Sequence, residues 1–208
     1  MNVHSGQDGR YTFVRIPKTG SLSMNTALWN ATEFAKSWRK NNNKNTWLQA
    51  PKANLWWDHY TAGFCLDTLG ETIWNESINF SVVRNPWARL YSLWKYNEEI
   101  SAKITFQDWI MSKCPYPRLP HHKFTEPEDF CSQLDWLTDK NGNIIVNFIC
   151  RLEELTSVGE PVFKSIVGND FKIPPVKKNK TSEPGEYKLH YNSEMIELVA
   201  TLCKKDIE

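Results

Sequence analysis

A stretch near the amino terminus, residues 11–23, constrains the fold of this chain more than any other. Its first six residues, YTFVRI, are mostly β-branched or aromatic, which is typical of a buried strand. The residues PKTG then break the strand. From Met24 onward, apolar residues recur at intervals of three and four, the spacing of one helix face. We therefore predict a strand, a tight glycine turn and a helix.

A junction of this kind is a potential anion site. The backbone N–H groups and the positive end of the helix gather at one point, and Lys18 adds a full charge there. Thr19, Ser21 and Ser23 add hydroxyl groups. The same residues also suit an ordinary strand–helix turn with a serine cap, so this stretch alone leaves both interpretations open.

A second unit of the same kind lies further along the chain. Ile78–Val83 is a predicted strand, and Pro86 takes the favoured first position of a helix whose apolar face includes Tyr91. Arg84 stands at the end of the strand, and Ser92 is predicted outside the apolar face, free to meet a ligand. Two such units predict an α/β fold with a central parallel sheet flanked by helices. Its ligand crevice is expected at the carboxyl ends of the strands.

The remaining elements are predicted from the same patterns. Residues 143–150 form a strongly apolar stretch that predicts another strand, and residues 130–137 could form a helix. A final helix is expected after Asn192 or Ser193, either of which can cap it. No repeat, low-complexity tract or change of composition marks a boundary, so residues 1–208 are expected to form a single domain.

Charge and composition exclude several classes of protein. The formal net charge is +1 and 24% of the residues are charged, which describes a soluble globular protein and not a general nucleic-acid binder or a disordered chain. No run approaches the ~20 apolar residues of a transmembrane helix, and no signal peptide precedes the first strand. A cytoplasmic location is therefore expected, unless the chain is an excised Golgi-luminal or secreted domain. The oligomeric state is not indicated.

Cysteine and histidine residues leave two alternatives each. The five cysteines are scattered without a CxxC pair, so no zinc site is expected. Cys114 and Cys131 bracket a proline-rich loop and could pair in an oxidising compartment, or they could stay reduced in the cytosol. His59 lies in the aromatic segment NLWWDHY, where a histidine is either a packed, hydrogen-bonded residue or a general base.

The first turn differs from the phosphate loop of nucleoside triphosphatases. That loop ends in Gly-Lys-Ser/Thr, whereas Lys18 precedes Gly20 here and no Walker B pattern follows, which argues against a nucleotide kinase. The motifs IPKTGS at residues 16–21 and VVRNPWARLYS at residues 82–92 resemble those of the PAPS-dependent sulfotransferases. The closer likeness is to the carbohydrate and Golgi-type branch, the heparan sulfate 2-O-sulfotransferase-like family. The resemblance covers nearly the whole chain, most weakly between residues 36 and 76.

The resemblance implies a P-loop-like, nucleotide-binding sulfotransferase fold and a role for each matching residue. The cofactor would be PAPS (3′-phosphoadenosine-5′-phosphosulfate), and its product PAP. Lys18 would stabilise the leaving group, and His59 falls roughly where relatives keep a general base. The 5′-phosphosulfate would be bound by Lys18, Thr19, Gly20, Ser21, Leu22 and Ser23. The 3′-phosphate would be bound by Arg84 and Ser92. A loop that includes Asn179, Lys180 and Thr181 would close over the cofactor.

Leu22 is a departure from the family pattern, which usually has threonine there, so one hydroxyl contact is missing. This departure favours a second interpretation, a non-catalytic nucleotide-binding module of the same fold. The retention of Lys18 and Arg84 argues against that interpretation.

The acceptor is expected to be a hydroxyl group, and the residues favour one on a carbohydrate. The tryptophan-rich residues 47–60 could stack on sugar rings, and the basic residues between 36 and 52 suit an anionic glycan. A phenol or another small molecule would use the same tryptophans. Sulfuryl transfer of this kind needs no metal.

Overall fold

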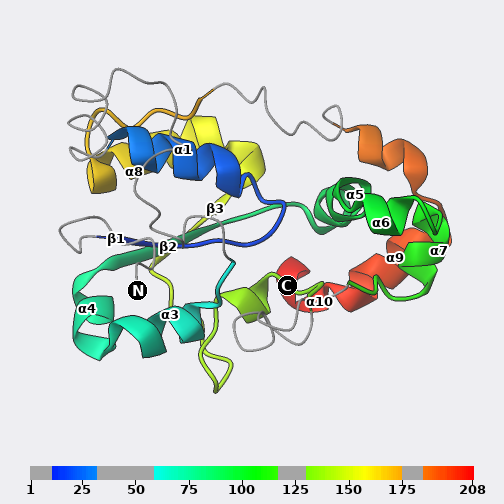
Figure 1. Cartoon of the computed structure of the whole chain (residues 1–208), viewed down its shortest axis with the longest axis horizontal. Helices are drawn as coiled ribbons and strands as arrows, with labels where there is room; N and C mark the ends of the chain where they lie inside the picture. Colours follow the sequence, from blue (N-terminus) through cyan, green and yellow to red (C-terminus); the bar gives the residue numbers. More distant parts are fainter. Residues whose placement is uncertain (1–10, 32–58, 117–129, 175–184) are drawn as a thin grey trace.

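The computed structural model describes residues 11–31, 59–116, 130–174 and 185–208. Within them, three parallel strands form one sheet in the order β1-β2-β3: β1 (Tyr11–Val14), β2 (Ile78–Val83) and β3 (Phe148–Arg151). Helices lie on both faces of the sheet (Figure 1). The structure confirms the predicted α/β fold with a parallel sheet flanked by helices.

The pairing of β1 with β2 brings the two predicted anion sites to one edge of the sheet. Val14, the last residue of β1, lies opposite Ser81, whose hydroxyl donates a hydrogen bond to the Val14 carbonyl at 2.8 Å. Because parallel strands end at the same edge, the chain leaves β1 and β2 side by side. The turns that follow the two strands are therefore neighbours.

Two helices cover one face of the sheet, α1 (Ser21–Ala31) and α8 (Glu160–Val167) (Figure 1). Phe13 and Phe80 stack in neighbouring strands with ring centroids 5.3 Å apart, and Phe163 of α8 packs on Phe80 at 4.9 Å. This apolar layer holds the start of α1 against the sheet, because buried Met24 belongs to the same cluster.

The opposite face is covered by α3 (Ala62–Leu69) and α4 (Glu71–Glu76) (Figure 1). Their buried side chains belong to the same cluster as Val14 at the end of β1. A second group of helices lies beyond the carboxyl ends of the strands and closes that end of the molecule. These helices are α5 (Pro86–Tyr96), α6 (Glu98–Ser101), α7 (Phe106–Met111), α9 (Ser193–Leu202) and α10 (Lys204–Ile207).

The predicted helix starts are confirmed at two places. Pro86 is the first residue of α5, and the Asn85 side chain accepts a hydrogen bond from the Ala88 N–H at 3.1 Å. Asn192 caps α9 by accepting from the Met195 N–H at 2.9 Å. Asparagine, rather than Ser193, is therefore the cap of the final helix.

Two predicted elements are shorter than expected. The strand predicted over 143–150 is confined to Phe148–Arg151, because Asn143 is part of a turn in which its N–H donates to the Asp139 carboxylate at 2.9 Å. The helix predicted over 130–137 is a single 3₁₀ turn, Leu134–Trp136. The N–H groups of Gln133 and Leu134, at its start, donate hydrogen bonds to the Asp206 carboxylate.

The five cysteines are all buried free thiols, so Cys114 and Cys131 are not joined by a disulfide in this structure. In the described ranges, no helix has both the length and the apolar character needed to span a bilayer.

Candidate active site

The turn after β1 has an unusual backbone. Lys18 has a φ of 68° and Gly20 a φ of 80°, so both lie in the left-handed region. A Cβ at Gly20 would lie 2.6 Å from Leu152 Cδ1, which gives this position a second reason to be glycine. Lys18 adopts the same region as a non-glycine residue. Strained backbone of this kind is found at binding and catalytic sites.

The start of α1 points unpaired N–H groups at this turn. The first hydrogen bond of the helix runs from the Met24 N–H to the Gly20 carbonyl at 3.1 Å. The N–H groups of Ser21, Leu22 and Ser23 therefore have no acceptor within the helix. Together with the positive helix end, they form an anion-binding arrangement to which Leu22 contributes through its backbone.

Thr19 closes the turn from within. Its side chain is fully buried, and the hydroxyl donates to the Ile16 carbonyl at 3.0 Å. The hydroxyl proton is thus engaged inside the protein.

The second turn makes direct contact with the first. Arg84 Nη1 donates a hydrogen bond to the Lys18 carbonyl at 3.2 Å. The Lys18 ammonium nitrogen lies 3.7 Å from the ring centroid of Tyr96, at the end of α5. Burial, and to a smaller extent the positive charge of Arg84, lower the pKa of Lys18 to about 8. Burial also lowers the Arg84 pKa.

These two cations form a site with the chemistry of an anion receptor. Burial removes water from both side chains, and the positive charge of Arg84 disfavours the charged form of Lys18. A negatively charged group bound beside them would favour the charged form of each.

Arg89 is a structural residue of the site that sequence reasoning missed. It is only 1% exposed, and its Nε donates to the Pro17 carbonyl of the first turn at 3.1 Å. Its Nη1 and Nη2 donate to the carbonyls of Cys131 and Phe130, both at 2.9 Å. The buried Arg89 side chain therefore connects α5 to the turn after β1, residues 17–20, which we call the lysine turn. The available signal was an arginine flanked by the apolar residues of a helix.

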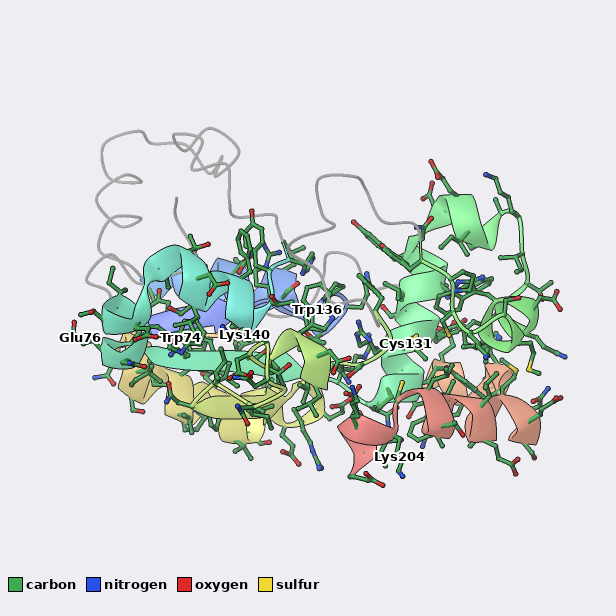
Figure 2. The ribbon with its side chains drawn as sticks, turned by 90° about the horizontal axis from the view of Figure 1, so that it is seen from below. Trp74, Glu76, Cys131, Trp136, Lys140 and Lys204 are labelled. Carbon is green, nitrogen blue, oxygen red and sulfur yellow. The ribbon has the colours of Figure 1, made fainter. Side chains whose placement is uncertain are left out.

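His59 lies at the same end of β1. Its Nδ1 is 3.0 Å from the Arg15 carbonyl, and because a carbonyl only accepts, Nδ1 carries the proton. In the neutral ring, Nε2 is then the basic nitrogen. The ring also makes an edge contact with Trp136, with centroids 6.2 Å apart. Figure 2 labels Trp136 on the 3₁₀ turn close to the sheet.

Ser92 differs from its predicted environment. It is only 2% exposed, so the expectation that it lies on an open face of the helix is wrong. Six consecutive residues of α5, from Ala88 to Leu93, are buried, which covers every side of the helix. Asn179, Lys180 and Thr181, predicted to close over a ligand, lie outside the described residues.

The chain that carries this arrangement matches a known protein family. A family model described as "Sulfotransferase family" matches residues 7–168, most of the chain, including both turns and His59. The chain belongs to the sulfotransferase family. Comparisons with curated proteins and with solved structures found no match. The protein is a sulfotransferase enzyme, of EC 2.8.2 type, and transfers a sulfuryl group to an acceptor hydroxyl.

The lowered pKa of Lys18 predicts a pH dependence for this sulfotransferase. As the pH rises through about 8, Lys18 of the free enzyme loses its charge, so kcat/KM for the anionic sulfate donor should fall. Replacing Arg84 with methionine removes a positive charge that lowers the Lys18 pKa, so the Lys18 titration should move upward. The rate of Lys18 acylation against pH, followed by peptide mass spectrometry, measures both values. A wild-type midpoint at the ordinary lysine value of 10.5 would contradict this prediction.

Proposed function

We propose that this sulfotransferase moves a sulfuryl group from PAPS to a carbohydrate hydroxyl, with Lys18 and His59 as its catalytic residues. The observation that supports the proposal best is the contact between the two cationic turns, Arg84 Nη1 to the Lys18 carbonyl at 3.2 Å. PAPS carries negative groups at both its 5′ and 3′ positions. Two adjacent cationic turns match that distribution of charge, whereas a single anion site would suit a 5′-phosphate alone.

The residues present fit this cofactor. The N–H groups of Ser21, Leu22 and Ser23 and the charge of Lys18 would hold the 5′-phosphosulfate, with Thr19 and Gly20 contributing backbone. Arg84 would hold the 3′-phosphate, and its planar guanidinium is well suited to that group. The predicted contacts of Asn179, Lys180 and Thr181 complete the proposed set, whereas buried Ser92 is left out of it.

Catalysis would rest on positioning and charge stabilisation. PAPS would supply an SO₃ group to the acceptor hydroxyl and leave as PAP, through the oxygen that bridges its sulfur to the 5′-phosphate. Lys18 would stabilise the negative charge that develops on that bridging oxygen. The N–H groups at the start of α1 would hold the non-bridging oxygens, and Nε2 of His59 would take the proton of the acceptor hydroxyl.

The carbohydrate acceptor is supported by the likeness of residues 16–21 and 82–92 to the carbohydrate and Golgi-type branch, the heparan sulfate 2-O-sulfotransferase-like family. The tryptophan-rich and basic composition of residues 36–60 is consistent with an anionic glycan. We propose further that residues 1–208 form one domain.

Calorimetry with nucleotides tests the cofactor. PAP should bind at least about 10-fold more tightly than ADP or ATP, because only PAP presents a 3′-phosphate to Arg84. Equal affinities would overturn the proposed function. A screen of acceptors with radiolabelled PAPS, beginning with glycans, tests the reaction. Transfer to phenols alone would replace the acceptor class, and tight PAP binding with no transfer to any acceptor would point to a non-catalytic module.

A further inference from the structure

The main chain of Arg84 is held by a side chain from a distant part of the sequence. Arg84 follows the last residue of β2, and the pairing with β3 ends at Val83↔Arg151. Its backbone groups therefore lie beyond the sheet, where buried polar groups need another partner. Gln133 supplies it: Oε1 accepts from the Arg84 N–H at 2.8 Å, and Nε2 donates to the Arg84 carbonyl at 2.8 Å. The Gln133 amide therefore makes the two backbone hydrogen bonds that a neighbouring strand would otherwise make with Arg84.

Asp206 of the C-terminal helix α10 in turn holds Gln133. Its Oδ1 accepts from the N–H groups of Gln133 and Leu134 at 2.8 and 2.9 Å. Its Oδ2 accepts from Gln133 Nε2 at 3.2 Å, the same nitrogen that serves Arg84. Figure 2 labels Cys131 and Trp136 on either side of this segment, and Lys204 at the start of α10.

This arrangement allows one orientation of the Gln133 amide. Gln133 is only 3% exposed, and its carbonyl oxygen faces a donor while its NH₂ group faces two acceptors. Turning the amide over would set donor against donor and acceptor against acceptor, and would leave each of these groups unsatisfied. The hydrogen bonds that link Asp206 through Gln133 to Arg84 can therefore form in only one arrangement.

The turn after β2, residues 84–85, which we call the arginine turn, makes further hydrogen bonds to other segments. Glu153 Oε1 accepts from the Asn85 N–H at 3.0 Å, and the Arg84 guanidinium contacts the Lys18 carbonyl. With its main chain held on one side and its Nη1 on the other, Arg84 has little freedom to redirect its guanidinium.

We propose that Gln133 and Asp206 are positioning residues for the 3′-phosphate of the nucleotide, acting through the main chain of Arg84. The inference rests on the proposed function, in which Arg84 binds that phosphate. It makes the C-terminal helix part of the nucleotide site, although the sequence separates Gln133 and Asp206 by 73 residues.

The test compares two nucleotides that differ only in the 3′-phosphate, PAP and 5′-AMP, by calorimetry. In the Gln133→Met and Asp206→Asn variants, the preference for PAP over 5′-AMP should fall about 10-fold, the scale on which supporting residues act elsewhere. Affinity for 5′-AMP should stay at its wild-type value. The matched control is Asp135→Asn, which breaks the exposed Lys205–Asp135 ion pair between the same two segments and should leave the preference intact.

A double-mutant cycle identifies the route of the effect. In an Arg84→Met background, the preference for PAP is already reduced, so adding Gln133→Met should change it no further. A purely structural role would weaken both nucleotides equally in the single variants, and that result would overturn the inference. An unchanged preference in a folded Gln133→Met or Asp206→Asn variant, checked by circular dichroism, would also overturn it. A wild-type enzyme that binds PAP and 5′-AMP equally would overturn the proposed function itself.

Discussion

Replacing Lys18 with methionine is expected to lower kcat by about 10²–10³-fold, the range seen when one group that stabilises transition-state charge is removed. Methionine is unbranched and one atom shorter than lysine, and it carries no charge. The bridging oxygen would then develop negative charge without a cation beside it. Single-turnover transfer of labelled sulfate measures the effect on the chemical step.

This loss should not come from instability. The pKa of Lys18 is lowered in the folded protein, so the unfolded chain binds the Lys18 proton more tightly and the charged form opposes folding at neutral pH. The free energy of unfolding of Lys18→Met should therefore equal or exceed that of the wild type. Circular dichroism during denaturant unfolding provides this measurement.

Lys95 provides a matched control. Like Lys18 it lies near a tyrosine ring, 5.4 Å from the centroid of Tyr91, and it pairs with Glu186 at 2.8 Å on an exposed surface. Lys95→Met should transfer sulfate at the wild-type rate. If Lys18→Met were as active as Lys95→Met, Lys18 would have no part in the chemical step.

Replacing His59 with asparagine should lower kcat by about 10²–10⁴-fold while leaving the affinity for PAP unchanged. The asparagine amide N–H can occupy the place of Nδ1 and keep the hydrogen bond to the Arg15 carbonyl. It has no group that can take a proton from the acceptor. The variant therefore separates the structural contact of His59 from its proposed role as a base.

Chemical rescue sharpens this test. His59→Ala should lose the same activity and recover part of it when imidazole is added to the buffer, because free imidazole can act as the missing base. His190→Asn is the control, since His190 stacks on Tyr91 at 4.7 Å and has no proposed role. A His59→Asn enzyme with wild-type kcat would mean that His59 is a structural residue that contacts Arg15 and Trp136 and takes no part in catalysis.

The features that could be predicted from sequence are those set by neighbouring residues. The strand Ile78–Val83 has the predicted bounds, Pro86 begins α5, and Asn192 caps α9. Periodicity and capping act over a few residues, so their signals are present in the local sequence. The same is true of residues 17–20, where Lys18 before Gly20 distinguishes the turn from the phosphate loop of nucleoside triphosphatases without any knowledge of the fold.

Ser92 shows where a local pattern is insufficient. A helical wheel distinguishes one apolar face, but α5 contacts α6, α7, α9 and the 3₁₀ helix Glu186–His190. Surrounded in this way, it buries residues on all sides. Which faces of a helix are covered is decided by the packing of other elements, and no spacing within residues 82–92 reports it.

The sequence by itself therefore determined two strand–turn–helix units with a cationic residue at each turn, their order, and the family to which the chain belongs. Only the tertiary structure decided how those turns are joined. The Arg84 contact with Lys18 spans 66 residues, and the Gln133 contact with Arg84 spans 49. The physical reason is that parallel pairing and core packing bring these segments together, and neither leaves a mark in the local spacing of polar residues.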